Sequence, residues 1–283
     1  MPRIAVVTDS TCDRGPAALA AMNVTMVPLK VHFGDETFRD WIDLTPTDFY
    51  PKLRASAQLP TTSQPTPGEF TDVYKRLAAE GFDGIVSIHL SQKLSGTVES
   101  ALMAAETSAI PVRVVDSMFV SCGLDFAIDA ACAARDKGAN LEAVEKAALS
   151  AVAGTELFFV VDTLDYLIKG GRGTRAQGMA AALLKIKPVL QVTGGVIEPF
   201  KKSKGTNKAI REMAEHVAAR SKKLGPLNLV VVHAVATNLA DELSNAIRSA
   251  GTDIAHIRVD EIGAVIGTHV GPRALGVGYA PAE

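Results

Sequence analysis

The sequence predicts an α/β protein made of two α/β domains with mainly parallel sheets. Short apolar segments alternate along the chain with longer helix-like segments, as strands and helices do in this fold class. Polar residues follow the ends of several apolar segments, which is where α/β sheets bind ligands. The chain has 283 residues, more than the roughly 100–200 of a usual single domain. We therefore expect domains at 1–153 and 154–283, with a cleft between them.

The first half of the chain is expected to contain three central strands and a hairpin. The strands are compact apolar runs at residues 4–8, 84–90 and 112–116, each followed by polar residues. Residues 23–33 have an extended pattern, and a Gly-Asp turn leads from them into residues 37–40. This arrangement predicts a hairpin.

Capping residues mark the helix starts in this half. Thr45-Pro46 and Thr66-Pro67 each place a hydroxyl at the cap and a proline at the first helical position, and Gly81 suits the end of the second helix. Further helices are expected at 16–21, 98–106, 127–137 and 141–152. The connector at 60–65 is therefore held at both ends by helices.

The second half repeats the alternation of strands and helices. It is expected to begin with a strand at 157–161 and a short helix at 163–169, followed by a glycine-rich loop at 170–174. The remaining elements are a helix at 179–184, extended segments at 188–192 and 196–197 joined by a glycine turn, a helix at 208–224, a strand at 227–232, a helix at 239–250 and a strand at 254–259. A glycine-containing tail at 263–272 follows.

Composition and charge exclude several classes of function. Lys and Arg number 29 against 31 Asp and Glu, for a net charge of −2, so no domain-wide basic field exists to bind nucleic acid. No apolar stretch approaches the ~20 residues of a membrane span, and the first apolar run is too short for a signal peptide. We therefore expect a cytoplasmic protein. Three cysteines without a C-x-x-C pair and six histidines without H-E-x-x-H predict neither a disulfide framework nor a metal site.

The segment 91–97 is the strongest candidate for binding an anion. It lies between a predicted strand and a predicted helix, and its residues Ser95, Gly96 and Thr97 offer hydroxyls and backbone N–H groups. The positive end of a helix dipole favours a carboxylate or phosphate at such a position. The hydroxyl-rich connector around Thr62 is a second candidate. Helix capping and ordinary turn chemistry explain both segments without a ligand.

Two more segments carry candidate polar side chains. The loop Lys169–Gly173 places two cations in a glycine-rich turn before a predicted helix, which suits a phosphate or an acidic partner. A helix end followed by a solvated Arg172 is the alternative. His269, in the tail, can donate to a carboxylate oxygen, or it is a buried structural histidine.

Taken in order along the chain, six short motifs resemble those of the DegV family of bacterial fatty acid-binding proteins. They are T-D-S-T-C-D at 8–13, T-S-Q-P at 62–65, L-S-G-T at 94–97, Y-L-I-K-G-G-R at 166–172, I-K-P at 186–188 and I-G-T-H-V-G-P at 266–272. The resemblance covers nearly the whole chain. It implies two α/β domains with a long-chain fatty acid buried at or near their interface, and no cofactor. In FakB-like members it also implies a separate fatty acid kinase as partner.

The resemblance also implies roles for particular residues. The hydroxyls of Thr62 and Ser95, with a backbone N–H near Gly96, bind the fatty acid carboxylate, and His269 lies close to the same head group. Arg172 matches the family arginine associated with the kinase step. A buried carboxylate needs several donors, and the acyl chain needs an apolar tunnel that contributes ~0.8 kcal/mol per buried methylene.

The chain departs from the family pattern at two positions. Family members commonly read G-P-G where this chain has Gly271-Pro272-Arg273, so we expect an added cation near the head group. They commonly carry Ile after the G-G-R arginine, where this chain has Gly173. We expect this glycine to loosen the loop that holds Arg172.

The leading hypothesis is a lipid carrier without enzymatic activity of its own. It would hold one long-chain fatty acid so that the kinase can convert the carboxylate to an acyl phosphate for phospholipid synthesis, with transient contact to a membrane surface. The alternative is an acyl hydrolase or transferase using Ser95, His269 and an acid such as Asp116, which the absence of a G-x-S-x-G elbow disfavours. A third hypothesis is a regulatory partner that contacts the kinase through Arg172 regardless of lipid.

Overall fold

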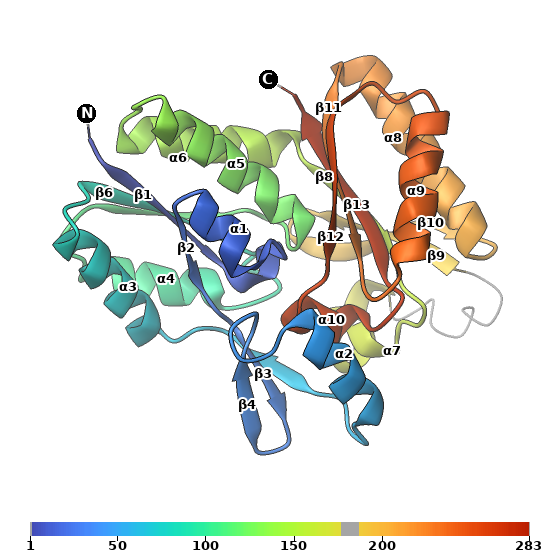
Figure 1. Ribbon diagram of the computed structural model, residues 1–283, viewed down its shortest axis with the longest axis horizontal. Coiled ribbons are helices and arrows are strands. Elements are labelled where there is room, and N and C mark those ends of the chain that lie inside the picture. Colours follow the sequence, from blue (N-terminus) through green and yellow to red (C-terminus); the bar gives the residue numbers. More distant parts are fainter. Residues whose placement is uncertain (1, 177–186, 283) are drawn as a thin grey trace.

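The computed structural model describes residues 2–176 and 187–282, and the predicted helix at 179–184 lies outside them. The described chain forms alternating layers of helices and sheets (Figure 1). Helices α3 (Pro67–Ala79) and α4 (Thr97–Ala105) cover one face of a four-stranded sheet, and α5 (Cys122–Asp136) and α6 (Leu141–Gly154) cover the other. Beyond α5 and α6 lies a six-stranded sheet, whose far face is covered by α8 (Thr206–Leu224) and α9 (Thr237–Ser249).

The four-stranded sheet is parallel throughout. Its strands are β1 (Ile4–Asp9), β2 (Val24–Val27), β6 (Gly84–His89) and β7 (Val112–Asp116), in the order β2-β1-β6-β7. Alternate side chains of β1 face opposite helix layers, with Ile4 and Val6 toward α5 and α6 and Ala5 and Val7 toward α3 and α4. A strand covered on both faces is apolar at every position, which is why the pattern is recognisable in the sequence.

The six-stranded sheet is mixed. Its strands are β8 (Glu156–Val160), β9 (Lys187–Thr193), β10 (Val196–Ser203), β11 (Leu227–His233), β12 (Ile254–Glu261) and β13 (Leu275–Pro281), in the order β10-β9-β8-β13-β11-β12. The predicted α/β fold class is confirmed. The expected predominance of parallel pairing holds in the first sheet, whereas here β11 and β12 are the parallel pair and the other neighbours are antiparallel. Two of the antiparallel pairs arise because the last strand, β13, inserts between β8 and β11, and the other two arise because β9 runs antiparallel to both β8 and β10.

Shorter elements lie at the end of the molecule where the two large sheets approach each other (Figure 1). A small sheet of order β4-β3-β5 contains β3 (Lys30–Phe33), β4 (Glu36–Arg39) and β5 (Thr61–Ser63). The helices there are η1 (Ser10–Cys12), α2 (Pro46–Ala55), α7 (Asp165–Lys169) and α10 (Ala264–Val270), whereas α1 (Gly15–Ala21) packs beside β2 of the four-stranded sheet. The expected hairpin is confirmed as β3 and β4, while β5 and α10 come from segments for which the sequence predicts no strand or helix. Among the described residues, no helix has the length and apolar character needed to cross a membrane.

The division at 1–153 and 154–283 stays a prediction. Helix α6 ends at Gly154, and the strands of the two large sheets come from opposite sides of this residue in the chain. However, α5 and α6 pack against both sheets, and one buried cluster joins residues of both halves, such as Phe49 and Leu190. The helical layer between the sheets therefore belongs structurally to both.

Candidate functional site

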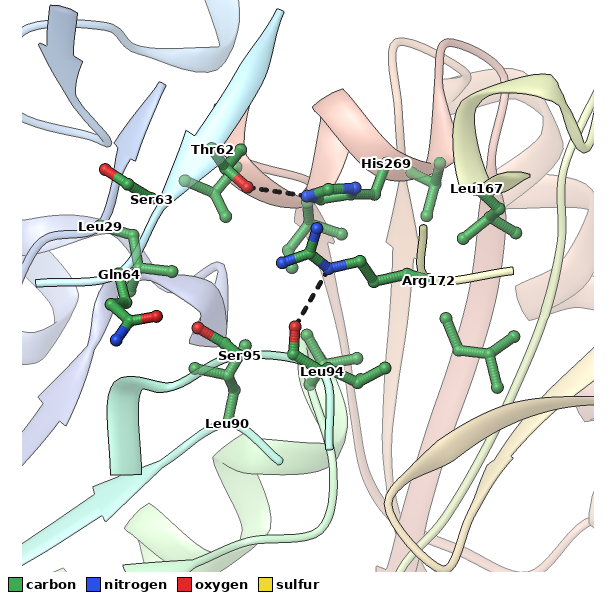
Figure 2. A pocket seen from close by; sticks show the side chains of 15 residues that line it. Leu29, Thr62, Ser63, Gln64, Leu90, Leu94, Ser95, Leu167, Arg172 and His269 are labelled. Carbon is green, nitrogen blue, oxygen red and sulfur yellow. Dashed lines mark hydrogen bonds between the residues drawn. The ribbon is translucent and has the colours of Figure 1, made fainter. Parts of the chain in front are cut away.

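A cavity of about 270 Å³ lies where β5, the segment 91–97, α7 and α10 meet (Figure 2). Most of its wall consists of leucine, isoleucine and valine side chains, including Leu29, Leu94, Leu167 and Ile266. Its polar side chains are Thr62, Ser63, Gln64, Ser95, Arg172 and His269. The cavity therefore combines an apolar wall with one group of polar side chains.

The structure brings four of the predicted site residues together. Thr62 from β5, Ser95 from the segment before α4, Arg172 from the loop after α7 and His269 from α10 all line this cavity, and Figure 2 shows their polar groups facing the same space. Gly96 does not line it but stands at the N-terminal cap of α4. Residues separated by more than 200 positions in the chain thus meet at one site.

Thr62 and His269 are directly hydrogen-bonded. Thr62 Oγ1 lies 2.9 Å from His269 Nε2, while His269 Nδ1 is buried without a hydrogen-bond partner among the described residues. Burial, with a smaller contribution from the positive charge of Arg172, lowers the pKa of His269 to about 4. The imidazole is therefore neutral at pH 7.

The environment of His269 Nδ1 determines which nitrogen carries the proton. A Cβ added to Gly170 would stand only 2.4 Å from Nδ1, so the ring packs against the backbone there. A buried N–H without an acceptor costs a full desolvation penalty, and we therefore assign the proton to Nε2. His269 then donates to Thr62, and the hydroxyl proton of Thr62 is free to be donated into the cavity.

Arg172 is a partly buried cation without an anion beside it. Its Nε donates to the carbonyl of Leu94 at 3.0 Å, and its Nη1 donates to the carbonyl of Gly170 at 2.7 Å. Burial lowers the pKa of its guanidinium, and no carboxylate of a described residue offsets this effect. Removing a cation from water is costly unless an anion compensates it, so the site favours an anionic ligand.

The turn that carries Ser95 is held in place by backbone hydrogen bonds. The carbonyl of Ser91 accepts from the N–H groups of Leu94 and Ser95, at 2.9 and 3.2 Å, and the N–H of Ser91 donates to the carbonyl of Phe119 at 2.8 Å. The hydroxyl oxygens of Ser95 and Thr97 are 2.9 Å apart. The position of the Ser95 hydroxyl is therefore set by the fold before any ligand binds.

Gln64 is a cavity residue that the sequence prediction misses. A Cβ on Gly96 would lie 2.5 Å from the Gln64 amide nitrogen, so the glycine is required for the side chain of Gln64 to pack here. Thr62 and Gln64 are two residues apart at the end of β5, the spacing that places side chains on one face of a strand. Recognising β5 as a strand would have identified Gln64. Ser63, between them, instead bonds to His32 at 2.8 Å.

The proposed hydrolase triad is not assembled. His269 contacts Thr62 rather than Ser95, and Asp116 accepts from the N–H of Met118 at 2.8 Å. No carboxylate of a described residue orients the imidazole, because Nδ1 has no partner. The alternative of a Ser95-dependent hydrolase or transferase therefore gains no support from the geometry.

A different Asp-His-Ser chain exists inside the four-stranded sheet. Asp9 Oδ2 lies 3.0 Å from His89 Nδ1, and His89 Nε2 lies 2.7 Å from Ser87 Oγ. All three residues have an exposed fraction of 0%, and the Ser87 oxygen also accepts from Tyr74. Asp9 additionally accepts from the N–H of Leu90. This chain joins β1 and β6 below the segment 91–97 and has no access to a substrate.

The structure shows the surroundings of Arg273 and Gly173, the two residues that depart from the family pattern. Arg273 is exposed and does not line the cavity, so its charge is not part of the polar group. Gly173 is packed and hydrogen-bonded against α7. Its N–H donates to the carbonyl of Leu167 at 2.9 Å, and a Cβ there would stand 2.8 Å from Leu167 Cβ. Close packing against α7 holds this part of the loop.

Among the described residues, no group of three or more His, Cys, Asp or Glu side chains could hold a metal ion.

Comparison with known proteins gives consistent results over the full chain. A family model described as "Uncharacterised protein, DegV family" matches residues 3–282. A DegV domain-containing protein of Streptomyces coelicolor is 39% identical over 274 residues, covering 97% of both chains. Protein DegV of Bacillus subtilis is 36% identical, covering 97% of this chain and 98% of its own.

Solved structures agree with this relationship. A DegV family protein from Thermus thermophilus, described as binding fatty acid, has a TM-score of 0.93 at 34% identity, covering 99% of this chain and 100% of that one. DegV from Bacillus subtilis, described as a fatty acid binding protein, has a TM-score of 0.91 at 33% identity, with 100% of each chain covered. The family-model match over nearly all residues, together with these relatives, shows that the chain belongs to the DegV family.

Proposed function

We propose that this protein binds one long-chain fatty acid in the cavity, with its carboxylate at the polar side chains and its acyl chain against the apolar wall. One observation carries this proposal. Among the described residues, no carboxylate offsets the partly desolvated guanidinium of Arg172, which lines the cavity together with the hydroxyls of Thr62 and Ser95, and most of the remaining wall is apolar. A single ligand with a negative head and an apolar tail satisfies both parts. The solved relatives described as fatty acid binding support the same ligand class.

Each polar side chain has a distinct task in this proposal. Thr62 donates its hydroxyl proton to the carboxylate because His269 already donates to the Thr62 oxygen. Ser95 donates a second hydroxyl proton from a position just before α4, where the positive end of the helix dipole favours an anion. Arg172 supplies the opposite charge. Hydrogen bonds to an ionised group are about twice as strong as neutral ones, so a small number of donors can retain the carboxylate.

We also propose that the protein is a carrier whose bound carboxylate is phosphorylated by a separate kinase. Arg172 suits contact with the partner because it is only partly buried, and it lies in the loop that follows α7. His269 bonds to Thr62 rather than to Ser95, so no base activates Ser95 as a nucleophile. A cytoplasmic location and brief contact with membranes would fit a protein that delivers acyl groups to phospholipid synthesis.

Fatty acid titrations of two variants test the carboxylate site. Ser95→Ala and Thr62→Val should each weaken oleate binding about tenfold or more, because each removes a hydrogen bond to a charged group. Oleyl alcohol, which has the same tail without the charge, should bind the variants and the natural protein with nearly equal affinity. Displacement of a fluorescent fatty acid gives the dissociation constants. Absence of oleate binding to the natural protein, or equal loss for acid and alcohol, would contradict the proposal.

A further inference from the structure

The turn between β9 and β10 packs on the segment that carries Ser95. The turn consists of Gly194 and Gly195, both in the left-handed region with φ of 54° and 82°, as a tight two-residue hairpin requires. Gly194 is exposed, and no atom lies within 4 Å of where its Cβ would stand. Gly195 is buried, and a Cβ there would stand 2.6 Å from Ser91 Oγ. Of the two glycines, Gly195 is thus the one at which a Cβ would collide with the segment 91–97.

Two side chains of that segment hold the turn. The buried hydroxyl of Ser91 donates to the carbonyl of Gly195 at 2.8 Å, and Lys93 Nζ donates to the carbonyl of Gly194 at 2.8 Å. Ser91 Oγ also accepts from the N–H of Lys93 at 3.2 Å. The two bonds to the carbonyls of Gly194 and Gly195 join the first half of the chain to the second, and we call them the hairpin latch.

The hairpin has few other restraints near its tip. Strand β10 is the outermost strand of the six-stranded sheet, so it is paired on one side. The register shifts between Pro199 and Lys201, and such a bulge bends a strand. Val189, at the base, packs in the cluster under α8, whereas Val192 and Ile197, near the tip, pack in the inner cluster. The base is therefore anchored on both sheet faces, and the tip is held by the latch, the inner core and the ion pair between Arg175 and Glu198.

The tip separates two cavities. Ile197 lines the candidate fatty acid cavity, while Val192 lines a second cavity of about 350 Å³. These two residues are direct cross-strand partners. Likewise Val120 lines the first cavity and its neighbour Phe119 lines the second. An outward movement of the tip would thus join the two spaces and open the side of the first cavity.

We propose that the tip of the β9–β10 hairpin is a movable wall of the acyl cavity, and that Ser91 is the positioning residue that latches it to the turn carrying Ser95. The inference rests on the proposed function for its ligand. The Ser91 carbonyl accepts from the N–H groups of Leu94 and Ser95, while its hydroxyl holds Gly195. Since Ser91 joins the preformed Ser95 turn to the hairpin, a carboxylate bound at Ser95 stabilises the closed latch over the acyl chain. Release of the ligand then requires the latch to open.

The two turn glycines provide a matched pair of variants. Gly194→Ala and Gly195→Ala place the same side chain at positive φ, but only Gly195→Ala collides with Ser91. Ser91→Ala removes the buried hydrogen bond directly. We expect Ser91→Ala and Gly195→Ala to release a bound fluorescent fatty acid, cis-parinaric acid, about five- to tenfold faster, the scale of one buried hydrogen bond. Gly194→Ala should keep the natural release rate. Stopped-flow displacement by excess oleate measures these rates.

Hydrogen exchange of the ligand-free protein tests the latch independently of the ligand. Ser91→Ala should increase exchange selectively in residues 187–203, with the four-stranded sheet unchanged. Release at the natural rate in both Ser91→Ala and Gly195→Ala, or a uniform increase of exchange over the whole chain, would overturn the proposal. Should Ser91→Ala fail to fold, Lys93→Met, which removes the exposed latch bond, must show the same selective exchange. A natural protein that binds no parinaric acid or oleate refutes the proposed function, and the exchange pattern alone then decides whether the latch exists.

Discussion

Arg172 and His269 are electrostatically coupled across the polar end of the cavity. The positive charge of Arg172 adds to burial in lowering the pKa of His269 to about 4, which keeps the imidazole neutral and able to donate to Thr62. An incoming carboxylate would compensate Arg172 and leave this arrangement intact. The neutral histidine is thus mainly a consequence of burial, and the charge of Arg172 lowers the pKa of His269 further.

Replacing Arg172 should change both the ligand affinity and the titration of the histidine. In Arg172→Met we expect oleate to bind about tenfold more weakly, as for loss of a charged hydrogen-bonding group, with oleyl alcohol unaffected. The pKa of His269 should rise toward its ordinary value because a nearby cation is removed. Imidazole NMR signals report the titration. Lys169→Met is the control, since Lys169 is an exposed cation of the same loop that does not line the cavity. Equal behaviour of the two variants would refute the role of Arg172.

Residue identities at the site could be predicted from sequence, but their bonding could not. Hydroxyls, glycines and an imidazole within the motifs that resemble the DegV family indicate Thr62, Ser95 and His269. Whether His269 contacts Ser95 or Thr62 depends on the path of α10 relative to β5, which no local pattern encodes. Gln64 was missed for a related reason, because its side chain enters the cavity only after β5 pairs with β3.

Helix α10 positions His269, and two carboxylates from the first half of the chain hold its N-terminal end. Asp13 accepts from the N–H of Gly263 at 2.8 Å, and Asp40 accepts from the N–H of Ala264 at 3.0 Å. Both carboxyl groups are buried, and burial raises the pKa of Asp40 to about 7. The position of the helix therefore depends in part on Asp40, whose charge changes near neutral pH.

The stability of the protein should decrease with rising pH through Asp40. Its folded-state pKa is about 7, above the ordinary value, so the folded chain binds the proton more tightly. The resulting stability is complete below the ordinary pKa and is lost as the pH rises through about 7. Relative to Asp40→Asn, the natural protein should lose roughly 2 kcal/mol of unfolding free energy between pH 5 and pH 8. Urea unfolding of both proteins measures it, and parallel pH profiles would show that Asp40 titrates normally.

Helices and strands whose own residues carry a clear hydrophobic or capping pattern were predictable from the sequence. Elements that form only by pairing with distant segments of the chain were not. The buried strands β1, β6 and β11 are largely apolar, and α3 begins with the expected cap, Thr66, which forms a capping box with Glu69. At α2 the hydroxyl of Thr45 donates to Asp48 instead of accepting from the backbone. Strand β13 contains Gly276 and Gly278, which weaken a strand pattern. Gly278 is required because Cys122 of α5 packs closely over it.

At the scale of the whole molecule, the site exists because the two large sheets are held in one orientation. Residues Thr62 and Ser95 come from the first half of the chain, and Arg172 and His269 come from the second. A buried ion-pair cluster joins the halves, in which Asp125 of α5 contacts Arg14 beside α1 and Arg258 of β12. The hairpin latch is a second connection. Sequence patterns predict each layer, whereas the meeting of the four side chains depends on how the layers pack.

The central claim is that the cavity holds an ionised carboxylate at its polar side chains. The most direct measurement is carbon NMR of palmitate labelled with ¹³C at the carboxyl carbon, added to the natural protein and titrated with acid. We expect one resonance distinct from free palmitate, with an ionisation midpoint below that of the free acid because hydroxyl donors and Arg172 favour the charged form, and this resonance should shift in Ser95→Ala. A carboxyl signal that titrates like free palmitate and is unaffected by Ser95→Ala would contradict the account.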